Sequence, residues 1–109
     1  MQTLIKQSKE GYMMRVNNYM TFGQALVELK SGGLVARSGW NGKGMFLFLV
    51  SGSTFKVNRA PLLGIFPEGR EVKYHAHIDM KTADEQIVPW LASQSDILAD
   101  DWVCHAPKD

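Results

Sequence analysis

Residues 35–44, with the sequence VARSGWNGKG, contain the side chains best suited to binding chemistry. Three glycines punctuate a turn that holds an arginine, a serine, a tryptophan, an asparagine and a lysine: Arg37, Ser38, Trp40, Asn41 and Lys43. An aromatic face can stack on a base, while cationic heads and the backbone N–H groups of a Gly-rich turn can hold phosphates. The segment therefore predicts a site for a nucleotide-like ligand.

The same segment also has a simpler interpretation. Asn-Gly between two apolar runs is a common hairpin turn, because both residues adopt positive φ, and a tryptophan near a turn often packs on the core. Residues 34–37 and 45–50 would then be the two strands of the hairpin. Trp40 has few apolar neighbours in the sequence, which favours an exposed or ligand-facing ring. Both interpretations stay open at this level.

The composition limits the class of protein. A chain of 109 residues, 45% hydrophobic and 21% charged, is typical of one soluble globular domain. Its net charge of +1 provides no field that would attract long nucleic acids, and the longest apolar run, residues 45–50, is too short to span a membrane. The single Cys104 rules out an intramolecular disulfide and, with no secretory segment near residue 1, indicates a reducing cytosol.

The expected elements follow from local signals. Thr21 and Gln24 form a capping-box pattern, which predicts that a helix begins here. The next apolar residues repeat at helical spacing and should form one buried stripe: Phe22, Ala25, Leu26 and Leu29. Gly32 and Gly33 should end this helix with a left-handed cap.

The second half of the chain gives mixed signals. Residues 54–70, rich in glycine and proline, predict a long irregular covering loop. Residues 72–80 alternate cleanly and predict one half-buried antiparallel strand, residues 86–88 predict a shorter one, and residues 101–104 the last. Between them, Ser93 and Asp96 resemble the start of a short helix that ends near Ala99.

These elements predict an α+β fold. We expect an N-terminal helix packed on an antiparallel sheet of about five strands, with a short second helix before the last strand. Residues 20–105 would form a single ligand-binding domain, preceded by a poorly ordered extension, residues 1–19, and followed by a polar tail, residues 106–109.

Catalytic and metal-binding patterns are weak. His75, His77 and Asp79 lie on one face of the predicted strand, as metal ligands would, but the flanking Lys73 and Lys81 would oppose a divalent ion. The neighbours Cys104 and His105 would point to opposite faces of a strand and so could not form a nucleophile–base pair. No metal, cofactor or enzymatic activity is expected.

Four motifs in one order carry a family resemblance. These are TFGQAL (21–26), ARSGWNGKGM (36–45), HAHIDMKTA (75–83) and VPWLASQSDILADDW (88–102). Together they resemble the small phage and prophage family that includes Thoeris anti-defence protein two, over residues 20–103.

The resemblance implies a sponge. Members of that family form homotetramers that bind, without cleaving, cyclic ADP-ribose isomers such as glycocyclic ADP-ribose, and some bind cyclic dinucleotides. In this chain, Trp40 would be the stacking platform and Asn41 a polar contact, within a binding segment at residues 37–43. The second half of the pocket would come from residues 79–82 and the start of the second helix, adding these ligand-binding candidates: Asp79, Lys81, Thr82, Ser93 and Asp96.

The leading hypothesis is therefore a phage or prophage protein that sequesters a cyclic nucleotide signal in the host bacterial cytosol and blocks Thoeris-type immunity. An alternative is a direct protein–protein inhibitor of a bacterial defence nuclease, similar to an anti-CRISPR protein, since the long loop at residues 54–70 could serve as a partner surface. An enzyme acting on a nucleotide is a third hypothesis.

Overall fold

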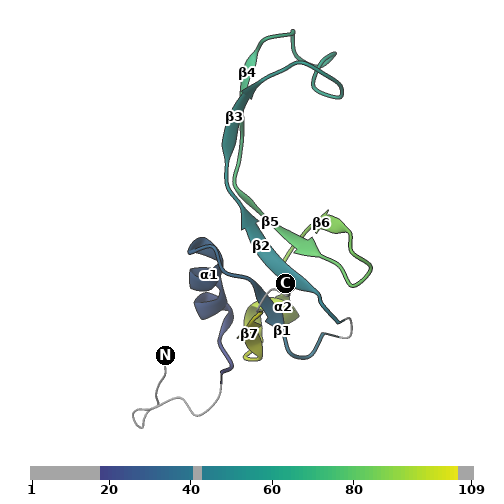
Figure 1. The fold of residues 1–109 in the computed structure, drawn as a ribbon. Coiled ribbons are helices and arrows are strands. Elements are labelled where there is room, and N and C mark those ends of the chain that lie inside the picture. Colours follow the sequence, from purple (N-terminus) through teal and green to yellow (C-terminus); the bar gives the residue numbers. More distant parts are fainter. Residues whose placement is uncertain (1–17, 41–42, 106–109) are drawn as a thin grey trace.

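A computed structural model describes residues 18–40 and 43–105 of the chain (Figure 1). It contains two helices and seven strands in its described part, in the order α1 (Phe22–Lys30), β1 (Val35–Arg37), β2 (Phe46–Val50), β3 (Ser53–Lys56), β4 (Glu71–Tyr74), β5 (His77–Lys81), β6 (Ile87–Pro89), α2 (Gln94–Leu98) and β7 (Trp102–Cys104). The predicted extension falls almost wholly outside the described residues, as does the predicted tail at residues 106–109.

Five strands form one antiparallel sheet in the order β6-β5-β2-β1-β7. Helix α1 packs against β1, β2 and β7, and α2 lies beside α1. This arrangement confirms the predicted α+β fold, including the short helix before the last strand. The buried centre of the core lies between α1 and the sheet and comprises Ala25, Leu29, Val35, Leu47 and Trp102.

Both predicted helix starts are confirmed. The Thr21 hydroxyl accepts a hydrogen bond from the Gln24 backbone N–H, and the Gln24 side chain accepts one from the Thr21 backbone N–H. Ser93 and Asp96 make the same reciprocal pair at the start of α2. Helix α1 ends as expected, because Gly32 adopts a positive φ of 94°, which glycine adopts without steric cost.

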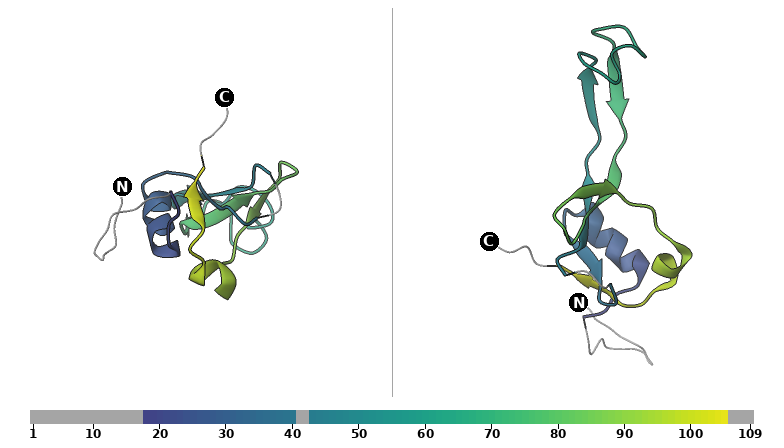
Figure 2. Two further views of the ribbon diagram at one scale, coloured as in Figure 1. Left: turned by 90° about the horizontal axis from the view of Figure 1, so that it is seen from below. Right: turned by 90° about the vertical axis from the view of Figure 1, so that its right-hand side faces the viewer.

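The prediction of a long irregular loop holds for residues 57–70, which form no helix or strand, but it is wrong for residues 54–56, which belong to β3, and the segment does not cover the core. Strands β3 and β4 pair in antiparallel register, from Ser53 opposite Tyr74 to Lys56 opposite Glu71, and form a separate two-stranded sheet. This hairpin, residues 53–74, projects away from the helices and the larger sheet, and we call it the arm (Figure 2). All four residues of β3 are exposed, so its sequence lacks the alternation that marks a half-buried strand.

The prediction of one continuous strand over residues 72–80 is also wrong. The segment divides into β4, which belongs to the arm, and β5, which belongs to the larger sheet, with His75 and Ala76 between them. The alternation of apolar and polar residues continues through such a bend, because it depends only on which side chains share a face of the strand. At the junction the Tyr74 ring stacks on the His77 ring, with centroids 5.2 Å apart and planes 21° apart.

Candidate functional site

The turn after β1 is anchored by an ion-pair cluster around Arg37. The Arg37 Nε donates to the Asp101 Oδ1 at 2.9 Å, and its Nη1 donates to the Asp96 Oδ1 at 3.0 Å. The Arg37 side chain is 22% exposed, and the two hydrogen bonds, first that to Asp101, raise its pKa. The guanidinium predicted to hold phosphate is thus already paired with two carboxylates.

The carboxylates of this cluster have no uncommitted oxygen. In Asp96, Oδ2 accepts from the Ser93 backbone N–H and hydroxyl, while Oδ1 accepts from Arg37. In Asp101, Oδ2 accepts from the Gly39 N–H at 2.9 Å and lies 3.4 Å from the Ser38 hydroxyl that donates to it. These bonds join β1, α2 and the residue before β7 into one network.

Ionisation of both carboxyls is favoured in the folded protein. Burial would raise the pKa of Asp96, but hydrogen bonds from Ser93 and then Arg37 outweigh it and lower that pKa below 3.8. Burial likewise opposes the ionisation of Asp101, and hydrogen bonds from Arg37 and Gly39 lower its pKa. The cluster therefore carries one positive and two negative charges at neutral pH.

Two backbone N–H groups at the start of α2, where part of the ligand pocket was predicted, already have partners within the protein. The Ser93 N–H donates to the Asp96 carboxylate at 3.1 Å, and the Asp96 N–H donates to the Ser93 hydroxyl at 3.0 Å. The capping box uses these donors to begin the helix. Both residues therefore have a structural role that competes with a direct ligand contact.

Trp40 differs from the expected exposed ring. Its indole is half-buried and packs against the core cluster, meeting Trp102 edge to face with ring centroids 5.6 Å apart. The antiparallel register of β1 and β7 places Trp102 opposite Arg37, three residues before Trp40 in the chain. The residue as a whole is partly exposed, and its ligand role stays a prediction.

The far end of the turn is held by Lys81. Its ammonium donates to the Gly44 carbonyl at 3.1 Å, pairs with Glu85 at 2.7 Å and lies 5.8 Å from the centre of the Phe46 ring. Lys43, next to Gly44, is exposed. Asn41 lies outside the described residues.

Two further predicted residues have local partners. The Thr82 hydroxyl donates to Asp84 and accepts from the Gln86 N–H, which closes the turn between β5 and β6. Asp79 is 15% exposed and lies 3.5 Å from the His77 ring. Because side chains alternate along β5, Asp79 and Lys81 lie on the face opposite Ile78 and Met80, which pack on the core.

Seven of the ten predicted residues thus fall into two separate groups. One hydrogen-bonded network contains Arg37, Ser38, Ser93 and Asp96, and the β5–β6 side contains Asp79, Lys81 and Thr82. Asp101, which joins the first network, was not predicted. Asp101 directly precedes Trp102, the strand residue that pairs with Arg37. The contact between Asp101 and Arg37 could therefore be predicted only once the register of these two strands was known.

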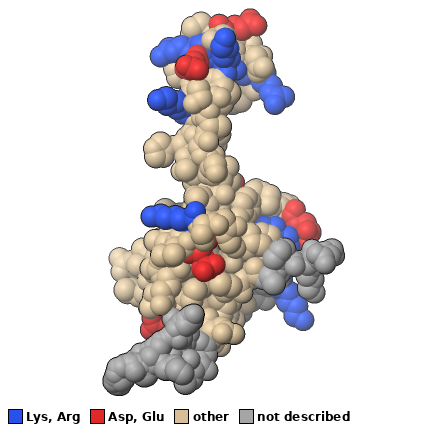
Figure 3. Space-filling model, turned by 60° about the vertical axis from the view of Figure 1, so that its left-hand side comes forward, with Lys and Arg blue, Asp and Glu red and all other residues tan. Residues whose placement is uncertain are grey.

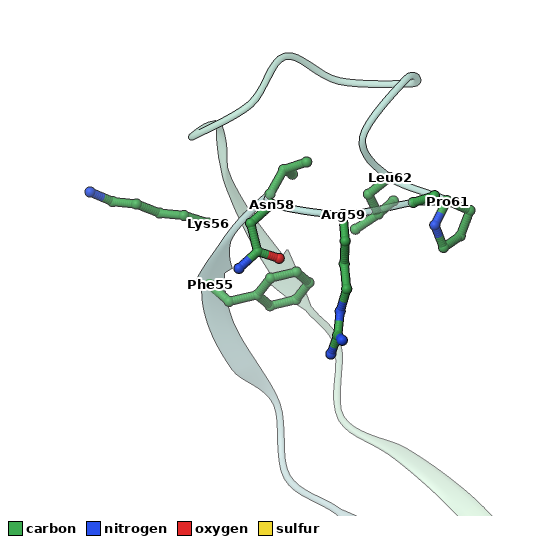
Figure 4. Close-up of a pocket in the computed structure, with 8 residues that line it drawn as sticks. Phe55, Lys56, Asn58, Arg59, Pro61 and Leu62 are labelled. Atoms are coloured by element: carbon green, nitrogen blue, oxygen red, sulfur yellow. The ribbon is translucent and has the colours of Figure 1, made fainter.

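A cavity of about 400 Å³ lies on the arm, and none of the predicted residues lines it (Figure 4). Its lining includes the Phe55 ring, Asn58, Arg59 and Pro61. The arm therefore carries a recess that the sequence did not indicate.

The sequence neighbours Cys104 and His105 contact different residues. Cys104 lies beside Glu28 of α1, and its burial, followed by the charge of Glu28, raises the pKa of the Cys104 thiol. The His105 ring packs instead on the Phe46 ring, with ring centroids 4.8 Å apart. Within residues 18–40 and 43–105, no three His, Cys, Asp or Glu side chains gather to hold a metal ion. None of the helices described is long and apolar enough to cross a membrane.

The fold and the site define a small α+β protein in which an ion-pair cluster holds an aromatic turn at the end of strand β1. Residues 20–105 match the family model described as the Thoeris anti-defense 2-like domain, and the chain belongs to this family. It is 46% identical over 83 residues to Thoeris anti-defense 2 of Bacillus phage SP01, covering 76% of this chain and 91% of that relative.

Proposed function

We propose that this protein is a phage or prophage anti-defence protein that binds and sequesters cyclic nucleotide immune signals without cleaving them. Cyclic ADP-ribose isomers such as glycocyclic ADP-ribose are the first candidates, and cyclic dinucleotides the second. The observation that carries the proposal is membership of the Thoeris anti-defense 2-like family, with the phage relative covered almost fully. The protein would act in the host bacterial cytosol against Thoeris immunity.

The turn between β1 and β2 supports this proposal chemically. Trp40 is partly exposed, and its ring would be the surface on which a base stacks. Exposed Lys43 offers a cation for a pyrophosphate, because no ion pair joins it to another residue in the described ranges. Arg37 and Asp96 would hold the turn in place instead of touching the phosphates, since each neutralises the other.

The decisive experiment examines what the protein retains. The purified protein is incubated with glycocyclic ADP-ribose, freed of unbound ligand, denatured by heat, and the released material is identified by mass spectrometry. Release of intact ligand is the expected result. Altered ligand would indicate an enzyme, and absence of retention, repeated with cyclic dinucleotides, would favour the protein–protein inhibitor instead.

We further propose that the working form is a homotetramer in which the arm contacts another copy. An isolated two-stranded hairpin is marginally stable in water, yet the arm exposes several large apolar side chains: Phe55, Leu63, Ile65 and Tyr74. Burial against another subunit would remove them from water.

Charge supports contact between the arm and the body of another copy. The arm has four basic residues, Lys56, Arg59, Arg70 and Lys73, and only two acidic ones. The other described residues have four basic and seven acidic side chains. Figure 3 shows the basic groups gathered at the end of the arm. Opposite charges favour the encounter of two such surfaces.

Light scattering at micromolar concentration tests this assembly. Ile65 of the arm is 67% exposed and Val27 of α1 is 66% exposed, so they form a matched pair. The Ile65→Glu variant should yield smaller species, whereas Val27→Glu should keep the mass of the wild type. A monomeric wild type, or equal effects of the two changes, would contradict the proposal.

A further inference from the structure

One residue, Asp101, holds the start of the turn that presents Trp40, through both its backbone and its side chain. Its backbone carbonyl accepts from the Ser38 N–H at 3.0 Å, and its carboxylate Oδ2 accepts from the Gly39 N–H at 2.9 Å. The Trp40 N–H in turn donates to the Arg37 carbonyl at 3.2 Å. Three consecutive residues of the turn thus depend on contacts with Asp101 or with its partner Arg37.

The Asp101 carboxylate is itself fixed. Its Oδ1 accepts from the Arg37 Nε, and the other end of that guanidinium is held by Asp96. Asp96 also accepts, through its carbonyl, a 2.9 Å hydrogen bond from the Trp102 indole, and Trp102 is fully buried. Rotation of the carboxylate would therefore break bonds that connect to the core.

The turn approaches this carboxylate as closely as its backbone permits. A Cβ atom placed on Gly39 would lie 3.0 Å from the Asp101 Oδ2, closer than nearly all real Cβ contacts. An alanine at this position would have to displace either the turn or the carboxylate. Glycine thus fits position 39 because it lets the backbone N–H reach the carboxylate.

We infer that Asp101 is a positioning residue that sets the orientation of the Trp40 ring and acts on ligand binding only through that ring. Both of its carboxylate oxygens already accept hydrogen bonds from the protein, so the carboxylate is not expected to contact a ligand directly. The ligand-binding part of this inference rests on the proposed function, whereas the orientation of Trp40 can be measured without ligand.

The ligand-free experiment is ¹⁹F NMR of the protein labelled with 5-fluorotryptophan. Its three tryptophans are Trp40, Trp90 and Trp102, and Trp40→Phe assigns the first signal. Asp101→Asn replaces one acceptor oxygen by an NH₂ group and should shift or broaden the Trp40 signal. The adjacent, exposed Asp100 provides the control Asp100→Asn, which should leave that signal unchanged. An unchanged Trp40 signal in folded Asp101→Asn overturns the inference.

The binding experiment is a double-mutant cycle with glycocyclic ADP-ribose as the probe. Asp101→Asn should weaken binding roughly tenfold in the wild-type background and less than about twofold in the Trp40→Ala background. Equal losses in both backgrounds would show that Asp101 acts independently of Trp40 and would overturn the inference. Absence of binding to the wild type would refute the proposed ligand, while the NMR result would still decide the positioning role.

A second variant covers the case in which Asp101→Asn does not fold. Gly39→Ala keeps every carboxylate and ion-pair partner and disturbs only the approach of the turn to Asp101. It should change the Trp40 signal in the same way as Asp101→Asn. A folded Gly39→Ala protein with the wild-type Trp40 signal would count against the inference.

Discussion

The Trp40 indole meets the fully buried Trp102 indole edge to face, with ring centroids 5.6 Å apart and planes at 79°. Aromatic pairs in this geometry attract each other because the positive edge of one ring faces the negative face of the other. The contact joins the predicted ligand platform to the core. Trp40 therefore has a structural role in addition to its proposed binding role, and the two must be separated by experiment.

Trp40→Ala should lower both ligand retention and stability. Loss of the stacking surface should weaken binding by roughly 1–3 kcal/mol, and loss of packing on Trp102 should lower the free energy of unfolding by about 1–2 kcal/mol. Urea denaturation and titration calorimetry measure the two effects. Trp40→Phe keeps an aromatic ring and should recover most of both. A binding loss without any stability loss would show that the Trp102 contact is energetically silent.

Arg37→Ala should destabilise the fold by about 1–3 kcal/mol, because it leaves the Asp96 and Asp101 carboxylates partly buried without their cation. Urea denaturation at neutral pH measures the change. Lys30→Ala removes one positive charge from the last turn of α1 and is the control for net charge; it should cost no more than about 1 kcal/mol. Equal losses in the two variants would mean that the cluster contributes only diffuse electrostatics.

Stability should fall in acid because the pKa values of Asp96 and Asp101 are lowered by folding. A group whose pKa is lower in the folded state stabilises the fold above its unfolded pKa, about 3.9 for aspartate. That contribution is lost as pH falls through the folded value. Denaturation between pH 7 and pH 2.5 should show a decline beginning near pH 4. The Asp101→Asn protein should decline less steeply, and identical slopes would contradict the assignment.

Lys43→Ala and Lys81→Ala should act differently. Lys43 is exposed, so its loss should change stability by less than about 0.5 kcal/mol while weakening ligand retention. Lys81 holds the Gly44 carbonyl and Glu85, so its loss should also lower the melting temperature. Titration calorimetry and thermal unfolding of both variants are the measurements. Loss of binding on charge removal at Lys6 or Lys9, in the predicted extension, would instead indicate nonspecific attraction.

Ser93→Ala should destabilise the protein by about 1 kcal/mol, since the capping box of α2 loses its acceptor for the Asp96 N–H. Ser95 is exposed and lies two residues after Ser93, so Ser95→Ala is the matched control and should be nearly neutral. Chemical denaturation compares the two. Equal free energies of unfolding for both variants would show that the cap of this short helix contributes little.

Much of the fold could be predicted from the sequence because its signals are local. A capping box acts across three residues, so Thr21 with Gln24 and Ser93 with Asp96 mark both helix starts without knowledge of the rest of the chain. The stripe that contains Ala25 and Leu29 likewise follows from helical periodicity, and these residues are buried as expected.

The arm could not be predicted in the same way. Its strands pair with each other and carry exposed side chains on β3, so residues 54–56 show no burial period, and glycine and proline nearby indicate irregular chain. The alternation of residues 72–80 was real, but pattern alone does not reveal that a strand leaves one sheet and enters another.

The sequence by itself determined the helix boundaries, the α+β class and the aromatic, glycine-rich character of the turn at residues 38–44. Only the tertiary structure decided how Arg37, Trp40 and Asp101 are used. Arg37 lies 59 positions from Asp96 and 64 positions from Asp101. The antiparallel register of β1 and β7 brings Asp101 to Arg37, and α2, which precedes β7, supplies Asp96. Side chains acquire such partners through strand pairing over long sequence separations, and no local pattern encodes that pairing.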